Sequence, residues 1–168
     1  QHGGSGGYFN GLIDEVSVWN TNLSTTEIQE LYADGVALDA TTHSKADTNL
    51  LGYWRNDGIS SWSDRNDMQA ISFNGTDEYI LASSINGFET SASGTSWSAW
   101  INPANTSSGE RSIVGRLSGV NQSYGAGISH NTTTLIGQAS NGSFNVQSTN
   151  TIVAGEWQHV AFTAKDGE

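Results

Sequence analysis

Two acidic stretches have the residue types that bind calcium. Asp77 follows the Asn-Gly turn of FNGTDEY, and Asp14 lies at a strand entrance in GLIDEV. Calcium takes several oxygen ligands, from carboxylates and loop carbonyls, at about 2.3–2.6 Å. Asp14, Asp77 and the carbonyl of Gly75 therefore form a candidate calcium site if the two segments meet in the fold. The alternative is that Asp77 only caps its turn and Asp14 is solvated.

Aromatic side chains are the second group of candidates, because an exposed ring can stack on the C–H face of a sugar. The chain has six tryptophans, and Trp62 stands in the polar loop SSWSDR. We take Trp62 as the candidate glycan contact; the alternative is that it folds back on a sheet edge. Trp97 and Trp100 fall on opposite parities of one strand, so they face opposite sides. Core packing is predicted for Trp54 and Trp157.

Residues for catalysis are not arranged as an enzyme would need them. Retaining glycosidases hold two carboxyl groups about 5–5.5 Å apart, and no predicted strand carries alternating carboxylates. His159 lies in a strand with no nucleophile near it, and it is expected to be a packed or edge residue. His2, His43 and His130 are expected in loops, and no hydrolase, zinc-protease or phosphate-loop motif occurs. We predict that the chain is not an enzyme.

The charge and composition of the chain limit the classes of binding partner that we expect. The chain has 168 residues, with 17 Asp and Glu against 6 Lys and Arg, and a net charge of -11. Such a surface repels phosphate backbones and anionic lipids, so neither nucleic acid nor membrane is expected as a partner. No apolar run approaches the roughly 20 residues of a membrane span. Zero Cys excludes disulfides and thiolate metal sites.

The N-terminal elements that would position these residues are a strand and a helix. LIDEVSVWN alternates as a strand with one face on a core, running from Leu12 to Trp19. NLSTTEIQELYADG predicts a helix from Thr25 to about Ala33, because Ser24 and Glu27 match a capping box. Leu23 and Ile28 are placed as a hydrophobic staple, Ile28, Leu31 and Tyr32 make one stripe, and Gly35 suits a left-handed C-cap.

The remainder of the chain has a β pattern. Residues 36–48 carry no sustained period and predict a connecting segment. Strands are then expected at Leu50–Trp54, Ala70–Phe73 and Tyr79–Ala82, and in the stretches TSWSAWINP, RSIVGRLS, YGAGISH and EWQHVAFTA. TTTLIGQASNGSFNVQS predicts a hairpin around Asn141-Gly142. Many short strands and one short α-helix indicate an all-β fold, an antiparallel β-sandwich.

Several of these stretches resemble one family. FNGLIDEVSVWNTNLSTTEIQELYADG is similar to the closing segment of LamG-like domains, in the concanavalin A-like lectin/glucanase superfamily. NLLGYWRNDG, AISFNGTDEYILAS, SWSAWINP, RSIVGR, YGAGI and GEWQHVAFTA resemble, in order, its opening two-thirds. The resemblance implies a concanavalin A-like jelly roll and matches tandem LamG-like domains of phage and bacterial surface proteins.

The order of these segments is rotated relative to the family. We interpret residues 1–35 as the closing strand and helix of one unit, 36–48 as a linker, and 49–168 as the opening two-thirds of a unit. The chain is either a slice of a tandem array or one rearranged sandwich. We favour the interpretation that the chain originated as a slice of a tandem array and that its N-terminal strand nevertheless packs into the same sandwich. A shortened stretch between SWSD and AISFNG leaves the register of the first strand open.

Function is expected to follow the family. The resemblance implies a structural calcium where an early loop meets the terminal strand, which supports the site at Asp14, Gly75 and Asp77. We predict a non-catalytic carbohydrate-binding or adhesion module of a larger surface or virion protein, hence an extracellular, cell-surface or virion location. Its expected partners are a glycan and neighbouring copies or chains of the same assembly. The alternative is a structural module completed by strand pairing with neighbouring chains.

Overall fold

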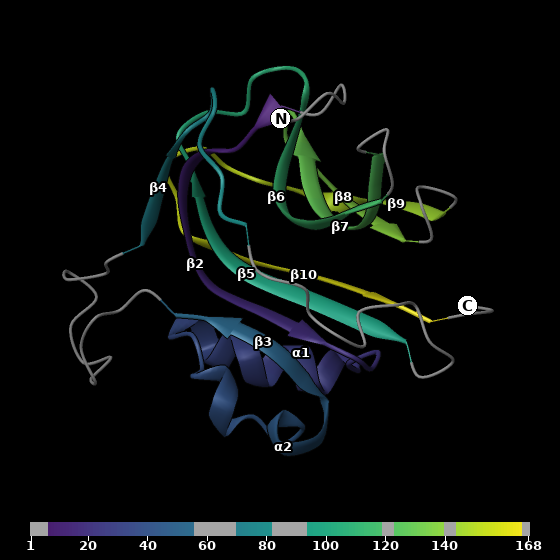
Figure 1. Cartoon of the computed structure of the whole chain (residues 1–168). Helices are drawn as coiled ribbons and strands as arrows, with labels where there is room; N and C mark the ends of the chain where they lie inside the picture. Colours follow the sequence, from purple (N-terminus) through teal and green to yellow (C-terminus); the bar gives the residue numbers. More distant parts are fainter. Residues whose placement is uncertain (1–6, 56–69, 82–93, 119–122, 140–143, 166–168) are drawn as a thin grey trace.

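The computed structural model describes residues 7–55, 70–81, 94–118, 123–139 and 144–165 (Figure 1). Ten strands run through these residues, and the helical elements lie between the second and third strands. The strands are β1 (Gly7–Tyr8), β2 (Asn10–Trp19), β3 (Leu50–Trp54), β4 (Ile71–Asn74), β5 (Thr95–Pro103), β6 (Glu110–Ser118), β7 (Ser123–Asn131), β8 (Thr134–Ala139), β9 (Phe144–Thr151) and β10 (Gln158–Ala164).

Two sheets pack face to face, as Figure 1 shows. One sheet has the order β1-β6-β7-β8-β9, and the other has the order β10-β5-β2-β3 with β4 also paired to β2. All pairings are antiparallel except the short one between β1 and β6. The predicted all-β antiparallel sandwich is confirmed.

The main core lies between the sheets and follows the alternation of the strands. In β5, Trp97, Ala99 and Ile101 point into it, while the residues between them point outward. The other strands add apolar side chains of the same parity. The buried members are Phe9, Ile13, Val18, Trp97, Ala99, Ile101, Ile128, Val160 and Phe162.

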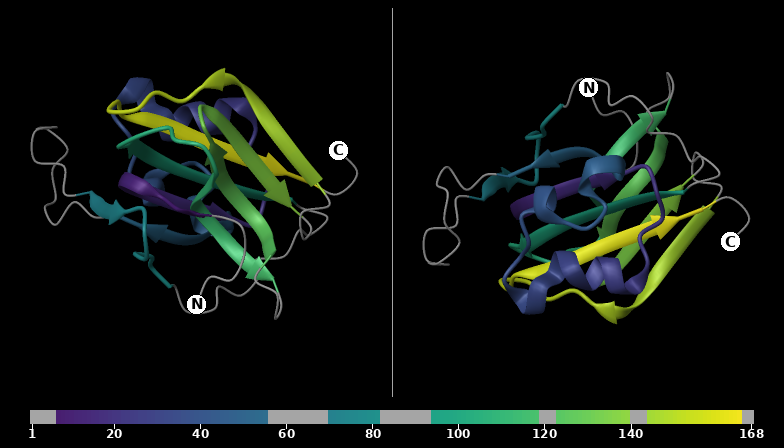
Figure 2. Two further views of the ribbon diagram at one scale, coloured as in Figure 1. Left: turned by 90° about the horizontal axis from the view of Figure 1, so that it is seen from above. Right: turned by 90° about the horizontal axis from the view of Figure 1, so that it is seen from below.

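A second apolar cluster covers the outer face of the β2 sheet. Trp19 is fully buried there against Leu23, Leu31 and Ala40. These partners come from the helical segment that follows β2. Figure 1 shows this layer beneath the sheet, and the right-hand view of Figure 2 shows it in front of the sheet. The prediction that β2 buries only one face was therefore wrong, because α1 and the residues after it cover the other.

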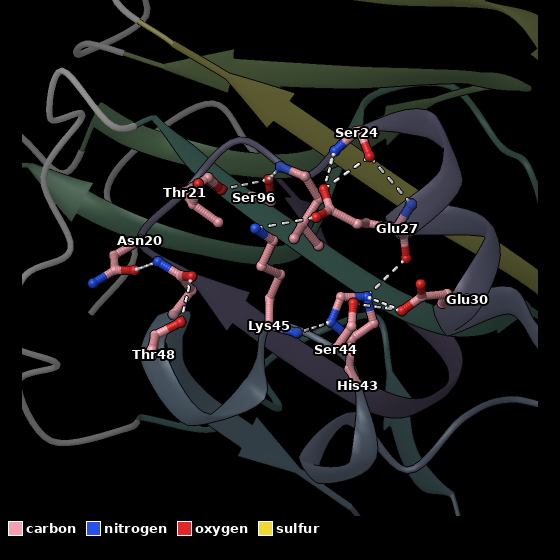
Figure 3. Close-up of polar contacts among 12 residues, drawn as sticks. Asn20, Thr21, Ser24, Glu27, Glu30, His43, Ser44, Lys45, Thr48 and Ser96 are labelled. Carbon is pink, nitrogen blue, oxygen red and sulfur yellow. Dashed lines mark hydrogen bonds and ion pairs between the residues drawn. The ribbon is translucent and has the colours of Figure 1, made fainter.

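Helix α1 (Thr25–Tyr32) begins as predicted. The Ser24 hydroxyl accepts from the Glu27 N–H at 3.3 Å, and the Glu27 carboxylate accepts from the Ser24 N–H at 2.8 Å (Figure 3). The capping box also lowers the pKa of Glu27, chiefly through the Ser24 backbone hydrogen bond. The left-handed C-cap falls at Ala33 (φ 45°), two residues before the predicted Gly35.

Residues 36–48 are more structured than predicted. They contain the 3-10 turn η2 (Ala40–Thr42) and the start of the single-turn helix α2 (Ala46–Asn49), after the 3-10 turn η1 (Ala33–Gly35) that follows α1. His43 ties this segment to α1: its Nδ1 accepts from the Lys45 N–H, and its Nε2 lies 3.0 Å from the Glu27 carbonyl oxygen (Figure 3). No helix among the described residues is long and apolar enough to span a membrane.

One predicted strand is not found among the described residues, and another is shifted by one residue. β4 begins at Ile71 rather than Ala70, and Tyr79–Leu81, expected to start a strand, has no regular structure. The chain turns after β4, where the Asn74 backbone N–H donates to the Glu78 carboxylate at 2.7 Å. The hairpin strands β8 and β9 are confirmed, while their Asn141-Gly142 turn lies outside the described residues.

Candidate functional site

The three residues predicted to bind calcium lie on two different parts of the β2 sheet. Gly75 and Asp77 follow β4, and the Cβ that a side chain at Gly75 would add lies 2.6 Å from Cβ of Asn10. Asp77 donates its backbone N–H to Asn74 Oδ1 at 3.2 Å. Asp14 lies within β2 and is 1% exposed. The turn is thus anchored near the start of β2, and Asp14 sits further along.

These positions do not share one point. Asp14 is four residues beyond Asn10 along β2, which corresponds to about 13 Å at the usual strand rise. Calcium ligands lie at about 2.3–2.6 Å from the ion, so Asp14 and the Gly75–Asp77 turn do not converge on one ion. Among the residues that the structure describes, no three His, Cys, Asp or Glu side chains gather as a metal site would require.

Whether the chain binds calcium at all is a separate question, and calcium binding stays a prediction. A thermal melt tests it. A bound ion raises the melting temperature by mass action, so the Tm in calcium should exceed the Tm in EDTA. If the Asn74 turn supplies the ligands, Asp77→Asn should remove that increase, whereas the matched change Asp47→Asn, in α2, should keep it. Equal melting temperatures of the wild-type chain in calcium and in EDTA would contradict the prediction.

The acidic residues of β2 are part of a buried polar network. Glu15 sits at a bulge with φ 51° and is 5% exposed, and its carboxylate accepts a hydrogen bond from the Tyr53 hydroxyl. Burial first, and then this carboxylate, raises the pKa of Tyr53, so the phenol stays protonated. Asp39, on the covering segment, pairs with Arg55. This network joins β2 and β3 and links the segment after β3 to the covering layer.

A column of aromatic rings reaches the surface beside this network. The Tyr32 ring, at the end of α1, stacks on Trp100 of β5 at 5.8 Å and 17°. His159 of β10 lies 5.5 Å from Trp100 and 6.3 Å from Tyr32. Trp100 is 8% exposed but Tyr32 is 44% exposed. The column is therefore anchored on two strands and presents the Tyr32 ring to solvent.

His159 borders the Trp100 side of the column, and Gly35 borders the Tyr32 hydroxyl. Burial lowers the pKa of His159 to about 4, so the imidazole is neutral at pH 7. Gly35 lies beside the phenol with φ 83°, and a Cβ there would lie 3.3 Å from the Tyr32 hydroxyl oxygen. A Cβ at Gly35 would be closer to the hydroxyl than an ordinary contact, and the positive φ also favours glycine there.

A second aromatic pair joins β1, of the other sheet, to the segment after β4. Tyr8 and Tyr79 have ring centroids 6.5 Å apart, and the neighbouring Ile80 and Leu81 are 56% and 81% exposed. Charged and amide groups of the Asn74 turn lie next to them in the chain. This surface follows the edge strand β4.

The aromatic residues singled out from the sequence are placed as follows. Trp62 lies outside the described residues. Trp97 and Trp100 face opposite sides of β5, as expected, and Trp54 packs against the core. Trp157 is partly buried. Tyr32 was treated only as part of the helix stripe; its hydroxyl and the following glycine are the signals that could have marked it as a surface ring.

The histidines correct one expectation. His130 is not in a loop but in β7, where it is 1% exposed and packs edge-on against Phe9. Burial lowers its pKa, against a smaller opposing effect of the hydrogen bond to Thr132. His43 is buried in the covering layer, and His2 lies outside the described residues. Neither buried ring lies beside the exposed face of Tyr32.

Comparison with known proteins gives one match. A family model described as the concanavalin A-like lectin/glucanases superfamily matches residues 74–168, more than half of the chain. No curated protein and no solved structure matches the chain significantly.

Proposed function

Because the chain belongs to the concanavalin A-like lectin/glucanases superfamily, we propose that it is a non-catalytic carbohydrate-binding or adhesion module. We place it in a larger protein of a cell or virion surface. Membership of this superfamily supports a module of that general kind. Domains of the LamG type are generally non-catalytic.

The exposed face of Tyr32 is the observation that carries the proposal. Sugar rings pack their C–H faces on aromatic rings, and a ring held by its own stacking partner loses little entropy when it binds. Trp100 and His159 hold Tyr32 on the two strands beneath it. Aromatic binding surfaces on such rigid elements need little rearrangement to accept a ligand.

The charge of the chain favours a neutral ligand. With a net charge of -11, the molecule repels sulfated or uronic acid-rich polysaccharides at low ionic strength. The ring that supports Tyr32 is a neutral imidazole, so it offers no cation to an anionic sugar. We therefore expect neutral hexose polymers to bind better than acidic ones.

The acids on β2 support a non-catalytic role. Asp14 and Glu15 are 1% and 5% exposed, beneath the covering layer. A glycosidase needs two carboxyl groups on opposite sides of an accessible glycosidic bond. Glu15 instead accepts a hydrogen bond from Tyr53, and its neighbour Asp14 Oδ1 accepts from the Glu15 backbone N–H at 2.9 Å.

Affinity electrophoresis of the purified chain in gels that contain a β-glucan, a galactan or a mannan tests the proposal. We expect at least one neutral polysaccharide to retard the wild-type chain and Tyr32→Ala to weaken that retardation at least about tenfold, which is about 1.4 kcal/mol. Tyr79→Ala, at a ring that is 53% exposed but far from α1, is the matched control and should bind like wild type. Equal binding by wild type and Tyr32→Ala, or no retardation in any gel, would argue against the proposal.

A structural or assembly module is the second candidate. The observation that favours it is the exposed stretch Tyr79–Leu81 beside the edge strand β4. Exposed edges and apolar segments are where neighbouring chains add strands. An oligomer in light scattering, together with no retardation by any glycan, would favour this role.

A further inference from the structure

The turn that follows Tyr32 has an unusual backbone. Ala33, Asp34 and Gly35 are three consecutive residues with positive φ values, of 45°, 54° and 83°. Glycine adopts this left-handed conformation readily, and aspartate tolerates it better than most residues, but alanine is disfavoured there. The fold thus keeps a tight left-handed turn at this point although the sequence supplies glycine at one position of the three.

This turn lies along the ring of Tyr32. Tyr32 is the last residue of α1, and a Cβ built at Gly35 would lie 3.3 Å from its hydroxyl oxygen and 3.6 Å from its Cζ. The ring therefore extends from the end of the helix back to Gly35, and the two residues between them border it. Asp34 is exposed at this border. An exposed acidic residue thus stands next to the exposed ring.

The Asp34 carboxylate has no other task in the part of the chain that the structure describes. No hydrogen bond or ion pair of these residues uses it. By contrast, Glu27 of the same layer is engaged in the capping box, and Asp39 pairs with Arg55. Both carboxylate oxygens of Asp34 are left to solvent or to a ligand.

A carboxylate beside an aromatic ring matches the two kinds of surface that a hexose offers. The C–H faces of the sugar pack on the ring, and the hydroxyl groups around its edge donate hydrogen bonds. An ionised carboxylate only accepts, and its two oxygens can accept from two adjacent hydroxyls. Hydrogen bonds to a charged acceptor are stronger than those to a neutral one. A few such polar groups fix the orientation of a ligand on an otherwise apolar surface.

We propose that Asp34 is the specificity-determining residue of the Tyr32 site and accepts hydrogen bonds from two adjacent hydroxyls of a neutral hexose whose C–H face lies on the Tyr32 ring. This inference rests on the proposed function, because it assigns the polar contact of the same site. Left-handed backbone at Ala33 and Asp34 is then part of the site, since it places the acidic residue at the border of the ring. The ligand class narrows to neutral polysaccharides with two adjacent free hydroxyls.

Affinity electrophoresis of Asp34→Asn, in the gel whose polysaccharide retards the wild-type chain, tests the assignment. Asparagine has nearly the same size and tolerates a left-handed backbone, but it has one acceptor oxygen and no charge. We expect retardation to weaken at least about tenfold. Asp34→Gly, which also suits a left-handed backbone, should weaken it at least as much. Asp47→Asn, at an exposed aspartate of α2, makes the same change in charge and should be retarded like the wild type.

An O-methylated form of the same polysaccharide provides a second test. O-methylation keeps the C–H faces of the sugar but removes its hydroxyl donors. Retardation of the wild-type chain should therefore weaken at least about tenfold, whereas that of Asp34→Asn should weaken clearly less, because its contact to the hydroxyls is already reduced. A residue that only maintained the shape of the turn would not change the response to O-methylation.

The outcomes separate this inference from the proposed function. If Tyr32→Ala weakens the retardation while Asp34→Asn is retarded like the wild type, the assignment of Asp34 is overturned and the role of the Tyr32 ring stands. Equal effects of O-methylation on the wild-type chain and on Asp34→Asn would also overturn the assignment. If no neutral polysaccharide retards the wild-type chain, both the proposed function and this inference are wrong.

Discussion

Replacing Trp19 with alanine is expected to lower the free energy of unfolding by about 3–5 kcal/mol, the usual cost of removing a buried Trp. The indole is fully buried, and its Nε1–H donates to Ser17 Oγ at 2.9 Å. It also packs edge-on against His43 at 4.8 Å and contacts the apolar cluster beneath the sheet. Because domains are stable by about 5–15 kcal/mol, this change removes a large fraction of the total.

Urea denaturation followed by near-UV circular dichroism measures the effect. Trp19→Phe keeps most of the ring volume and loses the N–H, so it should cost clearly less than Trp19→Ala. Val146→Ala, on β9 at a side chain that is 46% exposed, is a surface control that should change stability by less than about 0.5 kcal/mol. If Trp19→Ala is within 1 kcal/mol of wild type, then the helical layer does not hold the sheet as described.

Acidification from pH 7 to pH 4 is expected to cost about 3 kcal/mol of stability through His159. Burial lowers its folded pKa to about 4 from an ordinary value of 6.5. Below pH 6.5 the unfolded chain binds a proton that the folded chain excludes, so the free energy of unfolding falls until the folded imidazole also titrates near pH 4. Above about pH 6.5 His159 is mostly neutral in both the folded and the unfolded chain, so it takes no stability from the folded chain there. His130, whose pKa burial also lowers, acts in the same direction.

Urea denaturation at pH 7, 6, 5 and 4 tests this dependence. His159→Phe keeps a ring beside Tyr32 and Trp100 but cannot titrate, so its stability should fall less over this range than that of wild type. Glu27 and Asp39 do not mask the effect of His159 on the pH dependence of stability. Hydrogen bonding by Ser24 lowers the pKa of Glu27, and for Asp39 the bonds from Thr41 and the Arg55 charge outweigh its burial. Their contributions are therefore lost only near pH 4 and below. Parallel profiles for wild type and His159→Phe would refute the assignment.

Local structure could be predicted from sequence where neighbouring residues determine it. The capping box at Ser24 and Glu27 starts α1 at the expected residue, and β3 spans Leu50–Trp54 as predicted. The opposite orientations of Trp97 and Trp100 follow from strand alternation alone. In each case the information lies within a few residues.

Features that depend on distant partners could not be predicted. The alternation in β2 marks one apolar face, but it does not show that α1 returns to bury Trp19 on the other. Tyr79–Leu81 has strand-forming side chains, yet no strand pairs with it among the described residues, so it is not a strand. β propensity depends on the neighbouring strands, which the local sequence does not contain.

The candidate site shows the same limit. Asp14, Gly75 and Asp77 were grouped by chemistry, and whether they meet depends on the β2–β4 register, which aligns Asn10 rather than Asp14 with Asn74. Tyr32 becomes a surface platform only because β5 and β10 bring Trp100 and His159 beneath it. The sequence shows that the chain has aromatic residues. Which of their rings is exposed to solvent depends on how the strands pair.

The central position of β2 also affects how the protein is made. During synthesis, Ser17 is added 81 residues before Ser98, its partner in β5. At about 5–20 residues per second, translation leaves β2 without that partner for roughly 4–16 seconds. For that interval Ile13 and Val18, which face the core between the sheets, lack their β5 partners Trp97, Ala99 and Ile101. The strand that later becomes the middle of the sheet thus waits for its β5 partner while the chain is still being made.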